Sequence, residues 1–133
     1  MSACSDVTVI GLRELAAFVK RGDRVAARCC LFTRPPLALA REVAAQRPTE
    51  LTYPSSGGGP VLETLVAAGL AKQACISFSS LDLFGLAPRF RAAAESGALD
   101  IEDLNALAMI RGPAAPQQNL PSLPFQLPAR VEA

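Results

Sequence analysis

The chain has 133 residues, of which 50% are apolar and 19% charged, so it can bury the core of one domain and is not composed like a disordered protein. Its formal net charge of +1 gives no reason to predict nucleic acid or an anionic membrane as a partner. It contains no histidine, which excludes a Ser-His-Asp or Cys-His mechanism confined to this chain.

Targeting and metal-binding patterns are not found in the sequence. There is no uninterrupted apolar run of about 18 residues, so no membrane span is expected. Met1–Asp6 lacks the basic and apolar regions of a secretory leader, and a cytoplasmic location is the expectation. Cys4, Cys29, Cys30 and Cys75 show no zinc spacing; they are interpreted as buried small side chains, with a nucleophilic Cys29 or Cys30 as the alternative.

The first half of the chain alternates between helical and strand patterns. An amphipathic helix is predicted over Ile10–Arg21, followed by a strand buried on both sides over Asp23–Phe32. The next predicted elements are a helix over Leu37–Gln46, a strand over Glu50–Tyr53 and a helix over Val61–Ala68.

The second half continues the alternation. The predicted order is a strand over Lys72–Phe78, a loop over Ser79–Ala87, a helix over Pro88–Ser96, a strand over Ala98–Leu104 and a helix over Asn105–Ile110. Alternating strands and helices favour right-handed crossovers. The sequence therefore predicts an α/β fold, a three-layer open parallel sheet with helices on both faces.

The composition changes after Arg111. Five prolines lie within residues 112–128, with Gln117, Gln118 and Asn119 between them and no charged residue. Residues 1–111 are therefore predicted as the α/β domain and residues 112–133 as an extended proline-rich tail, ordered only where its apolar residues dock.

Two predicted loops follow strand ends, which is where ligands bind in open α/β sheets. The first loop precedes a helix, whose first N–H groups attract phosphates or carboxylates; a plain flexible turn is the alternative. In the second loop, serine hydroxyls offer contacts to an acyl or pantetheine group, or else cap the following turn. The candidate binding residues are Ser55, Ser56, Gly57, Gly58, Gly59, Ser79, Ser80 and Asp82.

Other charged side chains give weaker candidates. Arg89 and Arg91 could contact a phosphate or an acid substrate, or could be ordinary solvated helix residues. Glu102, with Asp103 beside it, is the one catalytic candidate, as an acid or base if burial raises its pKa.

Several segments resemble the A-type subunits of the family I CoA-transferases. Gly22–Val25 is similar to the start of the family's first strand, and Gly58–Leu62 to its glycine loop and helix. Ser77–Arg91 (SFSSLDLFGLAPRFR) resembles the "SxxSLxxFGLxPxFRxA" segment of the A-type chains from the glutaconate and cholesterol-ring-degradation groups. Leu123–Pro128 (LPFQLP) resembles the family's "GLPFLPTR".

The resemblance implies a fold and a function. Family members pair an A-type chain with a B-type chain, or fuse them, and bind the CoA ester between the two; a glutamate of the B-type half attacks the thioester in the transferases. The implied role is a subunit of a CoA-transferase, or of a CoA-ester hydrolase, acting on acyl-CoA thioesters, with coenzyme A thioester as substrate and no bound cofactor. The implied partner is a B-type subunit or a second copy. The alternative is a non-catalytic chain that stabilises or regulates a partner, or binds CoA esters.

The chain departs from the family pattern in three places. The family's A-type chains continue well past the "LPFLP" segment, whereas this sequence stops at Ala133, so the likeness covers their N-terminal half. Cys29–Leu31 replaces a glycine-rich turn that lets backbone N–H groups approach the thioester oxygen. Asn105–Leu107 replaces an acidic motif. The chain is therefore predicted to be inactive alone.

Overall fold

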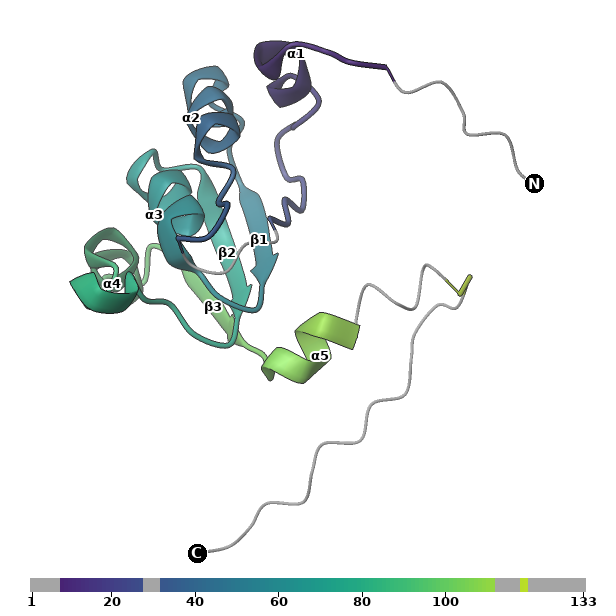
Figure 1. Cartoon of the computed structure of the whole chain (residues 1–133). Helices are drawn as coiled ribbons and strands as arrows, with labels where there is room; N and C mark the ends of the chain where they lie inside the picture. Colours follow the sequence, from purple (N-terminus) through teal and green to yellow (C-terminus); the bar gives the residue numbers. More distant parts are fainter. Residues whose placement is uncertain (1–7, 28–31, 112–117, 120–133) are drawn as a thin grey trace, which may run out of the picture.

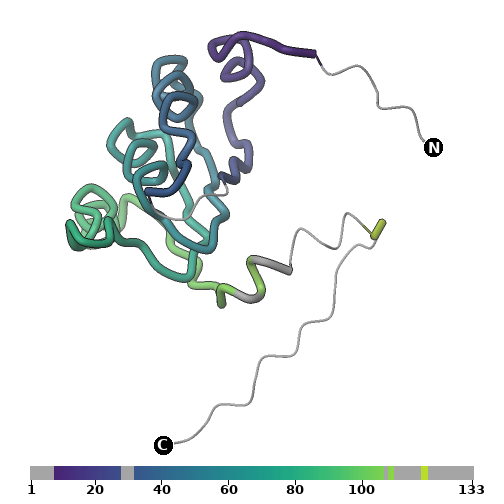
Figure 2. The backbone as a smooth tube through the Cα atoms, in the orientation of Figure 1, coloured from purple at the N-terminus to yellow at the C-terminus, as the bar shows by residue number. Residues whose placement is uncertain are grey.

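A computed structural model describes residues 8–27, 32–111 and 118–119 of the chain, shown as a cartoon in Figure 1 and as a backbone tube in Figure 2. The elements in chain order are α1 (Leu12–Ala16), α2 (Leu37–Gln46), β1 (Leu51–Ser55), α3 (Gly59–Ala67), β2 (Ala71–Ile76), the 3-10 helix η1 (Asp82–Phe84), α4 (Pro88–Glu95), β3 (Asp100–Asp103) and α5 (Ala106–Arg111). None of the helices in these ranges is long and apolar enough to cross a membrane.

The three strands form an open parallel sheet in the order β1-β2-β3. The predicted first strand joins this sheet beside β1 through one parallel bridge between Arg24 and Thr52. The Val25 N–H donates to the Thr52 carbonyl oxygen at 2.9 Å, and the Thr52 N–H donates to the Asp23 carbonyl oxygen at 3.0 Å. Residues 28–31 of that predicted strand lie outside the described residues.

Helices α2, α3 and α4 lie in a row along one face of the sheet (Figures 1 and 2). Because the strands follow one another across the sheet in chain order, right-handed crossovers bring each connecting helix to the same face. The predicted α/β class and open parallel sheet flanked by helices are confirmed. In the ranges that the structure describes, α1 packs on α2 and α5 follows β3, so the predicted helical layer on the second face has no counterpart there.

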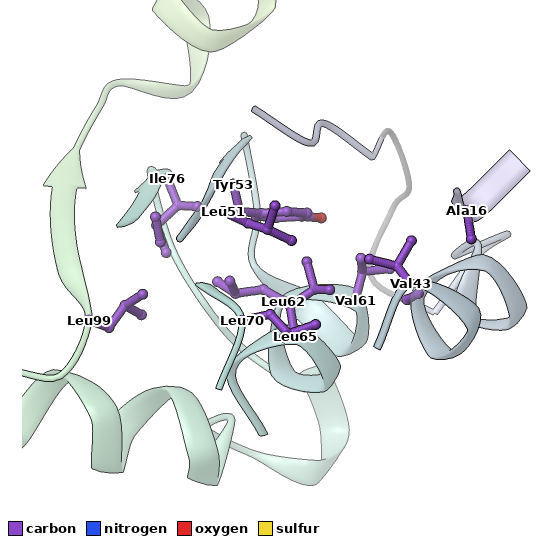
Figure 3. Packing of buried hydrophobic residues seen from close by; sticks show 12 residues of the cluster. Ala16, Val43, Leu51, Tyr53, Val61, Leu62, Leu65, Leu70, Ile76 and Leu99 are labelled. Carbon is purple, nitrogen blue, oxygen red and sulfur yellow. The ribbon is translucent and has the colours of Figure 1, made fainter. Parts of the chain in front are cut away.

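The core lies between the sheet and this row of helices. Strand side chains alternate between the two faces, so Tyr53 of β1 and Ala74 and Ile76 of β2 point toward the helices and are buried. Leu62 and Leu65 of α3 meet them from the helical layer (Figure 3). Burial of these apolar side chains holds the strand ends in a fixed position.

Most predicted boundaries agree with the structure to within about two residues, but the first helix is wrong in length. The structure ends α1 at Ala16 instead of Arg21. The chain leaves the helix through tighter turns at Phe18 and Val19, and the Asp23 carboxylate accepts a hydrogen bond from the Lys20 N–H at 2.8 Å. The predicted tail over residues 112–133 falls outside the described ranges, apart from Gln118 and Asn119.

Candidate functional site at the strand ends

The two predicted loops lie side by side at the carboxyl edge of the sheet. The Gly58 N–H donates to the Phe78 carbonyl oxygen at 2.9 Å. The Ser77 hydroxyl donates a short hydrogen bond to the Ser56 carbonyl oxygen. The structure therefore brings the segments after β1 and after β2 together, as their places in a parallel sheet predict.

Glycine is required where these loops touch. A Cβ atom placed on Gly58 would lie 2.5 Å from Ser79 Oγ and 2.9 Å from Ser79 Cβ. A Cβ atom on Gly57 would lie 2.8 Å from the tip of the Phe78 ring, which is half exposed and has room to move. The contact at Gly58 is therefore the tighter of the two, because its neighbour is packed inside the protein.

The beginning of α3 faces this junction with few free donors. Gly59 has a φ of 55°, in the left-handed region that suits glycine. No side chain caps α3, so its first N–H groups are open to other acceptors. However, the Gly58 N–H is already bound to Phe78, and Pro60 has no N–H. Of these three residues, Gly59 is left as the candidate backbone N–H donor, and it is buried.

The serines of the site have three different environments. The Ser55 hydroxyl donates to the Ala27 carbonyl oxygen at 3.4 Å, which links the end of β1 to the preceding strand segment. The Ser79 hydroxyl is buried, and it makes no hydrogen bond to any residue that the structure describes. It therefore reaches a ligand only if Gly58 and Ser79 separate.

Ser80 and Asp82 belong to a compact turn. The Asp82 N–H donates to the Ser80 hydroxyl at 2.9 Å, and that hydroxyl donates to the Gly85 carbonyl oxygen at 3.3 Å. The Leu81 N–H donates to the same Gly85 oxygen at 2.7 Å. These bonds give Ser80 the turn-capping role that the sequence left open as an alternative. Its binding role stays a prediction.

This turn presents large apolar side chains to solvent. Leu83 is 94% exposed and Phe84 is 79% exposed. The Phe84 ring packs edge-on against Phe32, with ring centroids 5.6 Å apart. We call Phe32, Leu83, Phe84 and the exposed Leu86 the apolar turn surface. Sequence reasoning missed this surface because the residues of a turn show no periodic hydrophobic pattern. Gly85, with a φ of 84°, was the local feature of the sequence that indicated a turn.

Glu102 lies in β3 opposite Cys75 of the neighbouring strand β2, one residue before the end of β3. It is two strands, roughly 10 Å, away from β1 and its glycine loop. Its carboxylate accepts a hydrogen bond from the Cys75 thiol at 3.2 Å, on the sheet face opposite the helices. Burial, and then this contact, raise the pKa of the Cys75 thiol, which keeps it protonated.

Glu63 makes a structural contact that sequence reasoning missed. Its carboxylate accepts hydrogen bonds from the Arg89 N–H at 2.7 Å and the Phe90 N–H at 2.9 Å, and so occupies the N-terminus of α4. Arg91 pairs with Glu95 at 2.7 Å on the same helix. The N-terminus of α4 is therefore occupied by the Glu63 carboxylate. Arg91 is an exposed helix residue paired with Glu95, as in the solvated alternative given above.

The described residues do not show the arrangement that a metal site needs. Across residues 8–27 and 32–111, no group of three or more His, Cys, Asp or Glu side chains is arranged to hold an ion.

Solved structures of known proteins are similar to this chain in fold. No protein-family model matches the chain, and no curated protein matches it in sequence. Among solved structures, it is similar to glutaconate coenzyme A-transferase from Acidaminococcus fermentans, with a TM-score of 0.76, 28% identity, and coverage of 91% of this chain and 39% of that one. It is also similar to a variant of the decarboxylase AibA/AibB, with a TM-score of 0.76, 26% identity, and coverage of 84% of this chain and 44% of that one.

These two structures agree with the resemblance found in the sequence. The chain spans less than half the length of either matching chain. The chain has the open parallel α/β fold of the glutaconate CoA-transferase and AibA/AibB chains.

Proposed function

We propose that the chain is a subunit of a CoA-transferase-like complex that acts on acyl-CoA thioesters, and that a partner subunit completes the site. The proposal is carried by the junction of the two strand-end loops, in a fold shared with a coenzyme A-transferase. In this position the Gly59 N–H and the start of α3 can stabilise negative charge that develops on a thioester oxygen.

The catalytic carboxylate is proposed to come from the partner. Within the described residues, Glu102 and Cys75 contact each other on the sheet face opposite the helices, and the raised pKa of Cys75 keeps its thiol neutral. A partner carboxylate that attacks the thioester carbon would form an acyl anhydride and release coenzyme A as its thiolate. This chain would bind and orient the thioester while the partner supplies the nucleophile.

The apolar turn surface is the proposed contact with that partner. It lies directly after Ser79 and Ser80, so a chain that covers it also covers the strand-end loops. Its turn is closed by its own hydrogen bonds, so little conformational entropy is lost when Leu83 and Phe84 become buried. Large exposed apolar side chains on a fixed turn are typical of a binding anchor.

A second candidate function is supported by a specific observation. The Ser79 hydroxyl is buried against Gly58 and the Ser80 hydroxyl closes a turn, so neither is open to a substrate. This favours a chain that binds CoA esters, or stabilises a partner, without contributing chemistry of its own.

The test is to co-express the chain with a B-type CoA-transferase subunit encoded beside it and to measure exchange of coenzyme A between an acyl-CoA panel and free carboxylic acids. The proposal predicts turnover by the complex and none by either chain alone. Full activity of the partner by itself, or no turnover by the complex over the whole panel, would contradict it. Binding of acyl-CoA without turnover would support the second function.

A further inference from the structure

A cavity of about 250 Å³ lies between α2, α3 and the strand segment that precedes them. The described residues that line it are all apolar, and they include Val25, Ala27, Leu39, Val43, Val61 and Leu65. Figure 3 shows Val43 of α2 and Val61 of α3 close to each other at this boundary between the two helices, with Leu65 further along α3.

The cavity runs along the helical layer beside the candidate site, and none of the residues Ser55–Gly59 or Ser79–Asp82 lines it. Pro36 and Val61 lie at the beginnings of α2 and α3, near the carboxyl edge of the sheet. Val43 and Leu65 lie more than one helical turn further along these helices. Ala27 lines the cavity, and its carbonyl oxygen accepts the hydrogen bond from the Ser55 hydroxyl. The space therefore adjoins the first residue of the glycine loop.

The apolar side chains that line the cavity indicate which kind of ligand it can bind. None of the described lining side chains carries a charge or a hydrogen-bonding group, so water in the cavity would lack partners there. Apolar cavities of this kind bind apolar ligands. At roughly 30 Å³ for each group of the size of a water molecule, the volume accepts on the order of eight chain carbons.

We propose that this cavity binds the unbranched apolar acyl chain of the CoA thioester, with the thioester group at the Ser55–Gly59 loop. The inference rests on the proposed function and adds the substrate class: medium-length aliphatic acyl-CoA. Each methylene group that enters the cavity leaves water, which strengthens binding. The polar end of the substrate stays at the loop junction.

The test compares acetyl-CoA with octanoyl-CoA, using calorimetry on the full chain. The inference predicts that octanoyl-CoA binds at least tenfold more tightly. Ala40, which lines the cavity, is replaced by leucine to fill it: Ala40→Leu should remove the preference for octanoyl-CoA and leave acetyl-CoA binding unchanged. Ala45→Leu, at an exposed position of the same helix, is the matched control and should keep the preference.

The possible results distinguish failure of the acyl-chain cavity from failure of the proposed function. Equal affinity of the wild-type chain for the two thioesters would overturn the acyl cavity and leave the proposed function intact. Failure of both to bind when the partner subunit is also present would contradict the proposed function itself. A preference that survives in Ala40→Leu would also overturn the cavity. If that variant does not fold, Ala27→Leu fills the opposite wall and provides the same comparison.

Discussion

Gly58 is the residue at which the two halves of the site touch. Replacement by alanine places a Cβ atom 2.5 Å from the buried Ser79 hydroxyl, so the loops must separate or the fold must strain. We expect Gly58→Ala to lower the free energy of unfolding by about 1–3 kcal/mol, as overpacking does elsewhere. Urea unfolding measures this.

Two other glycines provide the controls. Gly57→Ala should cost less, because the exposed Phe78 ring can turn away. Gly11→Ala meets no atom within 4 Å and should change stability by less than about 0.5 kcal/mol. If Gly58→Ala and Gly11→Ala unfolded at the same urea concentration, the close contact between the loops would be wrong.

Cys75 is expected to be an unreactive thiol. Burial and the Glu102 contact raise its pKa, so it stays protonated at neutral pH and iodoacetamide should alkylate its peptide much more slowly than free cysteine. The folded state holds this proton more tightly than the unfolded state. Its stabilising contribution is therefore complete below the ordinary thiol pKa and is lost as the pH rises above it.

Glu102→Gln tests whether the Glu102 carboxylate contributes to the raised Cys75 pKa. Loss of the negative charge should lower that pKa and raise the alkylation rate at alkaline pH. Glu95→Gln, on exposed α4, is the control and should change nothing. Alkylation of native Cys75 at the rate of the free amino acid would refute the burial of Cys75 and its contact with Glu102.

At the scale of elements, Glu63 joins α3 to α4. Its two hydrogen bonds reach N–H groups that the helix itself leaves without partners, and both are charge-assisted. Glu63→Ala should therefore lower the free energy of unfolding by about 1–2 kcal/mol, as loss of an N-terminal cap does. Glu95→Ala removes an exposed pair within α4 and should lower stability clearly less than Glu63→Ala does. Equal losses in thermal unfolding would show that Glu63 does not hold the two helices together.

The η1 turn is expected to contribute to assembly and little to folding. Leu83→Ser combined with Phe84→Ser removes two side chains that are 94% and 79% exposed, so the melting temperature should stay nearly constant. Association with the partner subunit, measured by analytical ultracentrifugation, should weaken at least tenfold. Val9→Ser, at a position 92% exposed near the other end of the helical row, is the matched control. Unchanged association of the double variant would place the interface elsewhere.

At the scale of the whole molecule, the fold could be predicted from local features of the sequence. Pro36 before α2 and the Arg47-Pro48 pair after it fix that helix, and short apolar runs mark β1 and β2. The adjacency of the Ser55–Gly59 and Ser79–Asp82 loops followed from parallel strand order alone.

The details of the site could not be predicted in this way. The Ser79 hydroxyl is buried because of the Gly58 contact, and Glu63 reaches Arg89 across 26 positions of the chain. Such contacts depend on packing between elements, which has no local pattern. The short length of α1 also depends on packing between elements. Leu12 and Leu15 are 44% and 42% exposed, so burial of its apolar face stabilises this helix only weakly.

The central claim is that a CoA thioester binds where the glycine loop meets the segment after β2. The most direct test is a titration of the ¹⁵N-labelled full chain with acetyl-CoA, followed by the backbone amide shifts. The account predicts the largest changes at Gly57, Gly58, Gly59 and Val61, with Gly11 and Gly97 unaffected. Saturable binding that shifts other amides while leaving the glycine loop unchanged, or no shift at all at millimolar acetyl-CoA, would contradict it.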